Sequence, residues 1–269
     1  MRILHIKKKL RFIVIILYIL ITSSTLLALN PSIVFDRGMK SFKSGNYRSA
    51  ELQFRDLINA DNSDYTDQAR FYYALSIYYQ KKFKSAIFEF NSFLNKSTSA
   101  VLQTEARFWI GEAYFYLFDY VKAIELFKRY IKGSNNIPLK IRARDRIGTI
   151  YYSQKRFEEA IIEWKKAITV SNNKEQNGRL LVQIGDAYFN NRNYNEALKI
   201  MNRIITSRNN ATVIAKAKII IGRIFQIKKR HGSALILFNG IPKKIQDLKA
   251  FAEINYYKAL SNIKLNRVE

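Results

Sequence analysis

The feature that most constrains this chain is a repeat of about 37 residues. Each repeat is marked by an alanine that has an aromatic residue or a histidine three positions before it and a large side chain four positions after it. A glycine or a further alanine lies twelve positions before it. Self-similarity at a fixed period of this length predicts an array of equal supersecondary units that bury their apolar faces against one another. The marking alanines, spaced 36 or 37 residues apart, are Ala50, Ala86, Ala123, Ala160, Ala197 and Ala234.

The composition favours helices in these units and argues against most site chemistry. The 269 residues include three prolines and ten glycines, too few for the turns of an all-β fold, and 48% of the residues are hydrophobic. We therefore predict an all-α protein with a substantial core. The chain has no cysteine, and its two histidines are His5 and His231. Because these residue types supply most metal ligands and many nucleophiles, we expect no metal, no cofactor and no catalytic residue.

The recurring columns resemble the tetratricopeptide repeat (TPR), a helix–turn–helix unit marked by a small residue, then tyrosine, alanine and phenylalanine. With the marking alanines numbered as position 20, the small residues fall at position 8 and the large ones at positions 11, 17 and 24. The resemblance implies a right-handed superhelical solenoid of about six TPR-type hairpins over residues 31–241, followed by a capping helix at 248–265. The hairpins, called repeats 1 to 6, are expected at 31–66, 67–103, 104–140, 141–177, 178–214 and 215–241.

Position 8 has a physical role in this arrangement. A glycine or alanine there, opposite the alanine at position 20, lets the two helices of a hairpin approach closely while the large side chains fill the space around them. A glycine inside a helix costs about 1 kcal/mol relative to alanine, so its recurrence implies that close packing offsets the cost. The period exceeds the usual 34 residues of a TPR by about three. We expect this surplus between repeats, as in 132–138.

The N-terminal segment has the order of a secretory signal peptide. Four cations precede an apolar run over 12–21, and a hydroxyl-rich stretch then leads to Ala28. This order predicts a signal peptide over 1–28 with cleavage after Ala28. The alternative is an uncleaved anchor to the inner membrane over 12–29, although its hydroxyl residues weaken it as a membrane span. In either case we expect the rest of the chain to be exported, and to be periplasmic or envelope-associated in a bacterium.

The resemblance also implies which residues line the concave groove of the solenoid, because positions 2, 5, 9 and 12 of successive first helices do so in the TPR fold. Aromatic rings fill positions 5 and 12 mainly in the first three repeats, and cations fill position 2 in the later ones. Such a groove suits a segment of another protein that carries apolar anchors and acidic residues. The alternative is that the rings pack between neighbouring repeats. The predicted groove residues are Phe35, Phe42, Phe71, Tyr78, Phe108, Phe115, Tyr152, Arg142, Arg146, Arg179, Phe189 and Arg223.

Cations recur at the turn between the two helices of a repeat. We predict that they form a basic ridge along one edge, able to contact anionic lipid headgroups or other envelope polyanions. The alternative is local, because cations at the end of a helix complement its dipole and bind its last carbonyls. The ridge residues are Lys81, Lys82, Lys155, Arg156, Arg192, Lys229 and Arg230.

The formal net charge of +25 would by itself also fit a nucleic-acid-binding protein. However, the basic residues are spread over all the repeats rather than gathered in one patch. An export signal would also take the protein away from nucleic acid. We therefore expect no nucleic-acid partner.

The leader and the repeats together resemble two groups of bacterial envelope proteins. One is the TPR lipoprotein of outer-membrane β-barrel assembly, and the other is the periplasmic TPR protein that works with the Tol system. This chain lacks the lipidated cysteine of the first group and an obvious coiled coil like that of the second. We predict a non-catalytic exported scaffold or adaptor that binds a segment of an envelope protein in its groove, in envelope assembly or in organisation of the cell wall and outer membrane. The alternative is a basic-surface protein that binds membrane or cell-wall polyanions, or nucleic acid.

Overall fold

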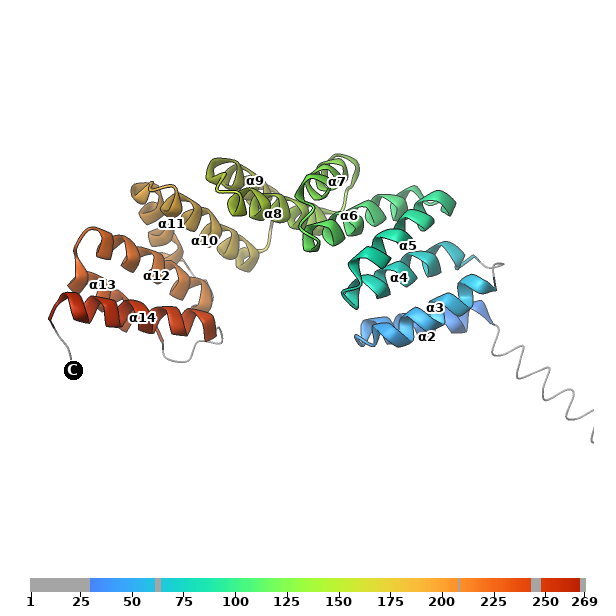
Figure 1. The fold of residues 1–269 in the computed structure, drawn as a ribbon, viewed down its shortest axis with the longest axis horizontal. Coiled ribbons are helices and arrows are strands. Elements are labelled where there is room, and N and C mark those ends of the chain that lie inside the picture. The colour runs from blue at the N-terminus through green and yellow to red at the C-terminus, as the bar shows by residue number, and fades with distance from the viewer. Residues whose placement is uncertain (1–29, 61–63, 208, 243–247, 267–269) are drawn as a thin grey trace, which may run out of the picture. The chain divides into compact units, whose positions relative to one another are not determined.

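The computed structural model describes residues 30–60, 64–207, 209–242 and 248–266, and all of the regular structure in these residues is helical (Figure 1). This confirms the predicted all-α fold. None of the helices described is both long enough and apolar enough to cross a membrane. The predicted signal peptide lies outside the described residues. The helices are α2 (Pro31–Lys43), α3 (Tyr47–Asn59), α4 (Thr66–Tyr79), α5 (Phe83–Lys96), α6 (Ala100–Tyr116), α7 (Tyr120–Gly133), α8 (Ile137–Ser153), α9 (Phe157–Val170), α10 (Lys174–Asn190), α11 (Tyr194–Thr206), α12 (Ala211–Ile227), α13 (His231–Asn239) and α14 (Leu248–Lys264).

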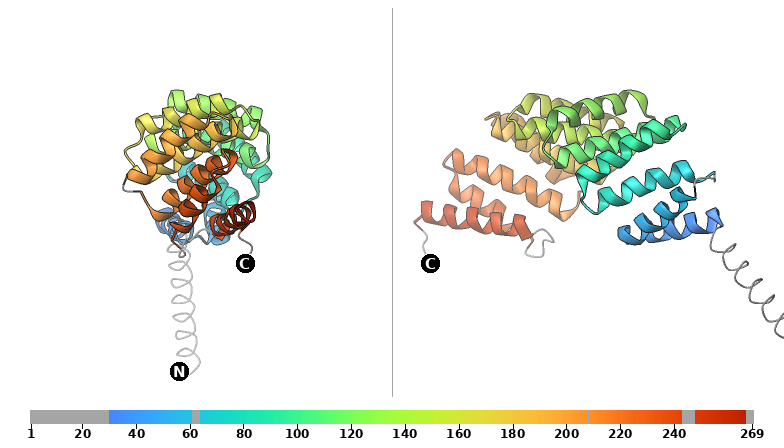
Figure 2. Two further views of the ribbon diagram at one scale, coloured as in Figure 1. Left: turned by 90° about the vertical axis from the view of Figure 1, so that its left-hand side faces the viewer. Right: turned by 45° about the vertical axis from the view of Figure 1, so that its right-hand side comes forward.

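Each predicted repeat corresponds to one pair of these helices, from α2 and α3 in repeat 1 to α12 and α13 in repeat 6, although the first helices of repeats 2 to 6 begin before the predicted boundaries. The paired helices contact each other, as α2 contacts α3 and α8 contacts α9, and second helices also contact the first helix of the next repeat, as α9 contacts α10. The chain divides into two compact units, residues 1–126 and 127–269, and the boundary falls inside α7. In the second unit α12 lies against both α13 and α14 (Figure 2).

The turn between the two helices of a repeat has the same backbone structure in all six repeats. In repeat 4 the N–H of Lys155 donates to the carbonyl of Tyr152 and the N–H of Arg156 donates to that of Tyr151, both at 2.9 Å. This pair of bonds is the Schellman motif that ends a helix, and it places position 15 in the left-handed region. In repeat 1 this residue is Gly45, with φ +79°. The other five, with φ between 59° and 64°, are Lys81, Phe118, Lys155, Arg192 and Lys229.

In repeats 3 to 6 the surplus residues lengthen the first helix, which corrects the expectation that they lie between repeats; the first helices of repeats 1 and 2, α2 and α4, have 13 and 14 residues. Helices α6, α8, α10 and α12 each have 17 residues and begin four residues before the predicted repeat boundary. In the segment 132–138 the residues outside helices are 134–136. The physical reason is that Asn136 accepts the N–H of Leu139 as an N-cap and Pro138 fits the first turn of α8. Residues that look like a linker in the sequence therefore start a helix.

The small residue at position 8 packs against the side chain at position 24, as predicted. A Cβ placed on Gly38 would lie 2.6 Å from Cε1 of Phe54, and one placed on Gly148 would lie 2.5 Å from Nε1 of Trp164. Phe54 is fully buried and Trp164 is 1% exposed. The marking alanines at position 20 are also fully buried in all six repeats. These contacts form the core of each hairpin.

Substitution of Gly148 tests this packing. We expect Gly148→Ala to lower the free energy of unfolding by about 1–3 kcal/mol, because the added methyl group overpacks against the Trp164 ring. This cost outweighs the gain in helix propensity of up to about 1 kcal/mol. Gly232 is the matched control, because it lies in helix α13 with no atom within 4 Å of an added Cβ. Urea unfolding followed by circular dichroism measures both variants, and equal effects of the two would contradict the packing argument.

Candidate functional site

Three successive first helices, α8, α10 and α12, form the walls of one open cavity of ≈ 690 Å³. The cavity lies within the second unit, residues 127–269. Of the predicted groove cations, Arg142, Arg146 and Arg179 line it and Arg223 does not. Lys216, which the sequence places at position 2 of repeat 6, joins them. The lining residues are Arg142, Asp145, Arg146, Glu175, Gln176, Arg179, Leu180, Val182, Gln183, Asn210, Thr212, Val213 and Lys216.

The convergence of these cations follows from the repeat itself. Arg142, Arg179 and Lys216 occupy position 2 of repeats 4, 5 and 6, so equivalent points on neighbouring first helices each present one cation. Helix α10 contacts α12 directly. Arg146 follows Arg142 by four residues, and residues four apart lie on the same face of a helix. Three helices therefore bring four cations to one cavity.

Both carboxylates of the cavity wall accept hydrogen bonds from side chains outside their own helix. Asp145 Oδ1 accepts from Nε1 of Trp164 at 3.0 Å and from Nε2 of Gln183 at 3.2 Å. Glu175 Oε1 accepts from Nδ2 of Asn210 at 3.3 Å. Four cations against two carboxylates give the cavity a net positive charge. Arginine side chains in such a setting bind carboxylates through paired N–H groups.

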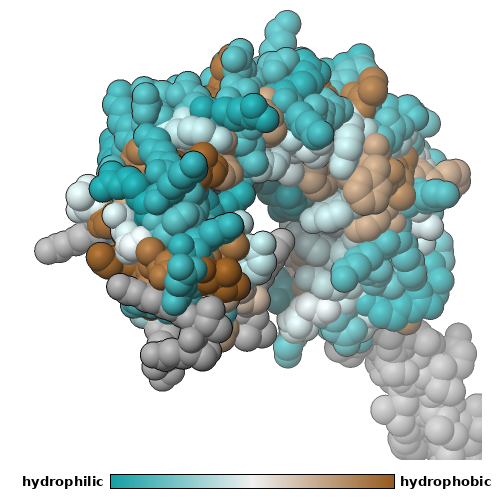
Figure 3. All heavy atoms as spheres, turned by 60° about the vertical axis from the view of Figure 1, so that its left-hand side comes forward, coloured by the Kyte–Doolittle hydropathy of each residue, from teal (hydrophilic) through white to brown (hydrophobic). Residues whose placement is uncertain are grey.

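The described residues contain no group of three or more histidine, aspartate or glutamate side chains placed to hold a metal ion. The face shown in Figure 3 is mostly hydrophilic, with hydrophobic side chains in small patches.

The predicted groove rings at position 5 lie in the hairpin cores. Phe71 is 3% exposed and Phe108 is fully buried. The ring of Phe71 packs against the rings of Phe90 and Phe93, with 5.8 Å between centroids in both cases. Phe35 is half-buried in the core cluster that contains Phe54. The sequence left open whether these rings line the groove or pack inside the fold, and their burial agrees with packing.

Most of the predicted groove rings at position 12 join neighbouring repeats. Tyr78 is 4% exposed, and its hydroxyl donates to Oε2 of the fully buried Glu112 in the next first helix, at 3.1 Å. The Tyr152 hydroxyl donates in the same way to Asp186. Burial and the hydrogen bond to Asp186 raise the pKa of the Tyr152 hydroxyl above its ordinary value. Tyr78 therefore does not have the exposed groove position that the sequence favoured, while Phe42 and Phe115 are half-buried.

Arg223 and Phe189 also belong to a joint between repeats. The Arg223 guanidinium lies 4.2 Å from the centroid of the Phe189 ring, which is 8% exposed. Its Nη1 lies 3.8 Å from Oδ1 of Asp186 and 3.9 Å from Oε1 of Glu253. Arg223 thus links helices α10, α12 and α14 instead of lining the cavity.

The joints alternate along the chain, which the sequence analysis missed. Position 12 of the even repeats is a hydrogen-bond donor, namely Tyr78, Tyr152 or Gln226, and each one bonds the helix that begins the next hairpin or, for Gln226, helix α14. Position 12 of the odd repeats is phenylalanine. The signal was present in the sequence, because that column alternates between phenylalanine and a polar side chain. Treating the column as uniformly aromatic concealed it.

All seven ridge residues are exposed, and three of them also make contacts within their own part of the fold. The Arg156 guanidinium lies 4.4 Å from the centroid of the Tyr151 ring, and its Nη2 lies 2.7 Å from Oε1 of Glu159. The Arg230 guanidinium lies 4.9 Å from the centroid of the Phe225 ring. These two arginines therefore support the alternative that the turn cations make local contacts. Their side chains lie over the aromatic ring at position 11 of the same repeat, and among the described residues they do not bind a helix carbonyl, the contact expected from the sequence.

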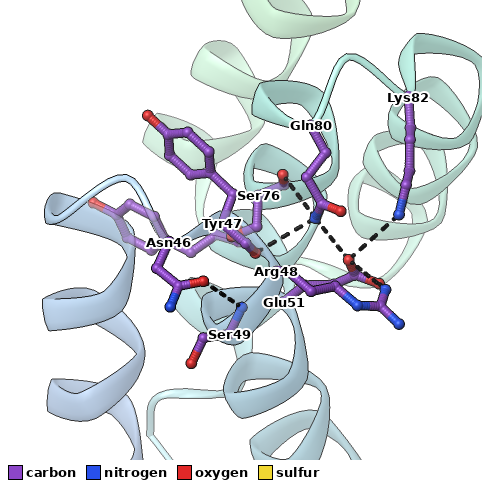
Figure 4. Close-up of polar contacts among 9 residues, drawn as sticks. Asn46, Tyr47, Arg48, Ser49, Glu51, Ser76, Gln80 and Lys82 are labelled. Atoms are coloured by element: carbon purple, nitrogen blue, oxygen red, sulfur yellow. Dashed lines mark hydrogen bonds and ion pairs between the residues drawn. The ribbon is translucent and has the colours of Figure 1, made fainter.

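Lys82 belongs to a polar cluster around Glu51, which is 7% exposed (Figure 4). Glu51 Oε2 accepts from Nε2 of Gln80 at 2.7 Å, and both Glu51 oxygens accept from Nη1 of Arg48 at 3.0 Å. Lys82 Nζ lies 3.8 Å from Oε2. Burial alone would raise the pKa of the Glu51 carboxyl, but the hydrogen bonds from Gln80 and Arg48 and the nearby charge of Lys82 outweigh it and lower the pKa. The cluster joins helix α3 to the α4–α5 turn.

Comparison with known proteins identifies the repeats. Residues 105–132, 141–174 and 178–210 match models of the tetratricopeptide repeat. These segments coincide with repeats 3, 4 and 5. The described helices therefore form a TPR-type solenoid, as the resemblance in the sequence implied. No curated protein matches the sequence.

Several solved structures share this fold. A crystal structure of MamA has 22% identity and a TM-score of 0.53, covering 65% of this chain and 90% of its own. PilF of Pseudomonas aeruginosa has 14% identity and a TM-score of 0.61, covering 84% and 96%. The apo form of RapI has 17% identity and a TM-score of 0.60, covering 89% and 98%. At these identities the likeness shows the fold alone.

Phe108 and Arg179 separate core residues from cavity residues. We expect Phe108→Ala to lower the free energy of unfolding by about 3–5 kcal/mol, because it leaves a cavity in a fully buried site. Arg179→Ala, at an exposed position, is expected to change it by no more than about 0.5 kcal/mol. Urea unfolding measures both. If Phe108→Ala were as stable as the parent, Phe108 would not be a core residue, and its predicted role in binding a partner would stand.

The lowered pKa of Glu51 predicts a pH-dependent contribution to stability. Because the folded pKa lies below the ordinary value, the stabilisation is present above the ordinary pKa of 4.5 and is lost as the pH falls through the folded pKa. Glu51→Gln should therefore lower the free energy of unfolding by about 1–3 kcal/mol at neutral pH. The difference from the parent should shrink in acid. Asp56→Asn, at an exposed carboxylate of the same helix, is the control. If Glu51→Gln lowered the free energy of unfolding equally at neutral and at acidic pH, the ionised Glu51 carboxylate would not be the source of the stabilisation.

Proposed function

We propose that this protein is a non-catalytic adaptor that holds an acidic segment of a partner protein in the cavity lined by α8, α10 and α12. TPR repeats in general bind other proteins, and the helical hairpins here supply such a scaffold. The observation that carries the proposal is the convergence of Arg142, Arg146, Arg179 and Lys216 on one cavity from three successive repeats.

The spacing of the cations favours an extended peptide over a compact small molecule. Packed helices lie about 8–10 Å apart, and α10 packs on α12, so Arg179 and Lys216 at position 2 of these helices present cations at about that interval. An extended chain advances about 3.3 Å per residue. Acidic side chains about three residues apart would therefore meet successive cations. Gln176, Gln183 and Thr212 in the same wall can bond the peptide backbone between them.

The proposed setting is the bacterial envelope, with the protein exported to the periplasm and acting in envelope assembly or in organisation of the cell wall and outer membrane. This part of the proposal is supported by the order of charges and apolar residues over 1–28 and by the resemblance of leader and repeats to envelope TPR proteins. The partner would then be an envelope protein with an acidic segment.

A synthetic peptide with glutamate at every third position, in a glycine–serine background, tests the cavity directly. We expect the full chain to bind it, and Arg142→Glu or Arg179→Glu to weaken binding by about tenfold or more, because each reversal removes an attraction and adds a repulsion. Lys155→Glu is the control, since it makes the same change in net charge at an exposed turn of repeat 4. Fluorescence anisotropy measures all four proteins. Equal weakening by Lys155→Glu would show that net charge, not the cavity, binds the peptide.

A further inference from the structure

The turn between α6 and α7 carries a side chain that neither the turn nor the core requires. Phe118 is 76% exposed and has φ +62°, in the left-handed region. Any side chain costs about 1–2 kcal/mol there relative to glycine, and Gly45 fills the same position of repeat 1. The Phe118 ring makes one edge contact, with Tyr120 at 6.0 Å between centroids. Val121, in the first turn of α7, is 79% exposed.

A pair of exposed lysines lies beside this apolar tip. Tyr116, at the end of α6 and 42% exposed, stacks on Phe83, the first residue of α5, with 4.8 Å between ring centroids and 6° between planes. Lys81 and Lys82 directly precede Phe83 and are both exposed. The stack therefore brings the α4–α5 and α6–α7 turns side by side within the first unit, residues 1–126.

We propose that these two turns dock on an anionic lipid bilayer, with Phe118 and Val121 entering the interface and Lys81 binding lipid headgroups, while Lys82 stays near Glu51. Aromatic side chains favour the headgroup level of a membrane, and cations near an anionic surface add attraction that falls off within a Debye length. The carboxylate at the tip does not oppose this, because Asp119 Oδ2 pairs with Lys122 Nζ at 2.9 Å.

A lipid surface fits the tip better than a second copy of the chain does. The formal net charge of +25 makes two copies repel each other and makes an anionic surface attract either one. The exposed side chains of the tip lie on a tight turn and on the first turn of helix α7. Membrane docking goes beyond the proposed adaptor function, because it uses the first unit and the peptide cavity belongs to the second.

The absence of cysteine from the chain makes a local test possible. In the full chain, Phe118→Cys and, separately, Phe88→Cys can each carry one environment-sensitive fluorophore; Phe88 is the matched control, 70% exposed in the middle of α5. With vesicles of phosphatidylglycerol and phosphatidylcholine we expect a blue shift and quenching by spin-labelled lipid at 118 and not at 88. The readout is local, so attachment of any other segment to the vesicle does not produce it.

Three further measurements test whether the tip docks on an anionic bilayer. Lys81→Gln should weaken the response at 118 several-fold on anionic vesicles. A label at Val121→Cys should respond in the parent background and not in Phe118→Gly, while Phe118→Gly should raise the thermal midpoint because glycine relieves the left-handed conformation. The proposal is overturned by equal responses at 118 and 88, by an equal response on pure phosphatidylcholine, by a blue shift that needs protein concentration instead of lipid, or by a lower thermal midpoint for Phe118→Gly.

Discussion

The contact between position 8 and position 24 is the interaction on which the other features of this structure depend. In repeat 4 it is the contact of Gly148 with Trp164, which lets α8 and α9 approach closely. The same indole then donates its Nε1–H to Asp145 in the cavity wall, and Asp145 also accepts from Gln183 in the next repeat. One packing contact therefore sets the hairpin, orients a wall residue and reaches the neighbouring repeat. A larger residue at position 8 would disturb all three.

The spacing of the cavity cations depends on the joints between repeats. In a solenoid each repeat interacts with its neighbours only, so the relative position of adjacent first helices is set by their direct contacts. Tyr152 and Asp186 join repeats 4 and 5, and Arg223 lies over Phe189 to join repeats 5 and 6. The N-terminal halves of these same helices line the cavity. Arg223 thus helps to fix the position of α12 relative to α10, although it does not line the cavity itself.

The sequence was sufficient to predict the hairpins and the convergence of the position 2 cations, because a fixed period places equal residues at equal points of the fold. It was insufficient for the rings at positions 5 and 12. A column shows which residue type recurs, whereas burial depends on the residue that faces it from the next repeat, as Glu112 faces Tyr78. The lengthened first helices were missed for a different reason. Asn136 and Pro138 occur in linkers and at helix starts alike, and the helix that follows decides between them.

At position 15, a residue that differs in type from the others is more informative than the residue type that recurs. The backbone has the same left-handed conformation in all six repeats, and glycine, which adopts it at least cost, occurs there once. The side chains at the other five positions are therefore tolerated by the turn instead of being selected by it. Four of them are cations, which water solvates well at an exposed turn. The apolar ring of Phe118 is poorly solvated by water and makes little contact within the fold. Its presence at this exposed turn is explained by the proposed insertion into a lipid bilayer.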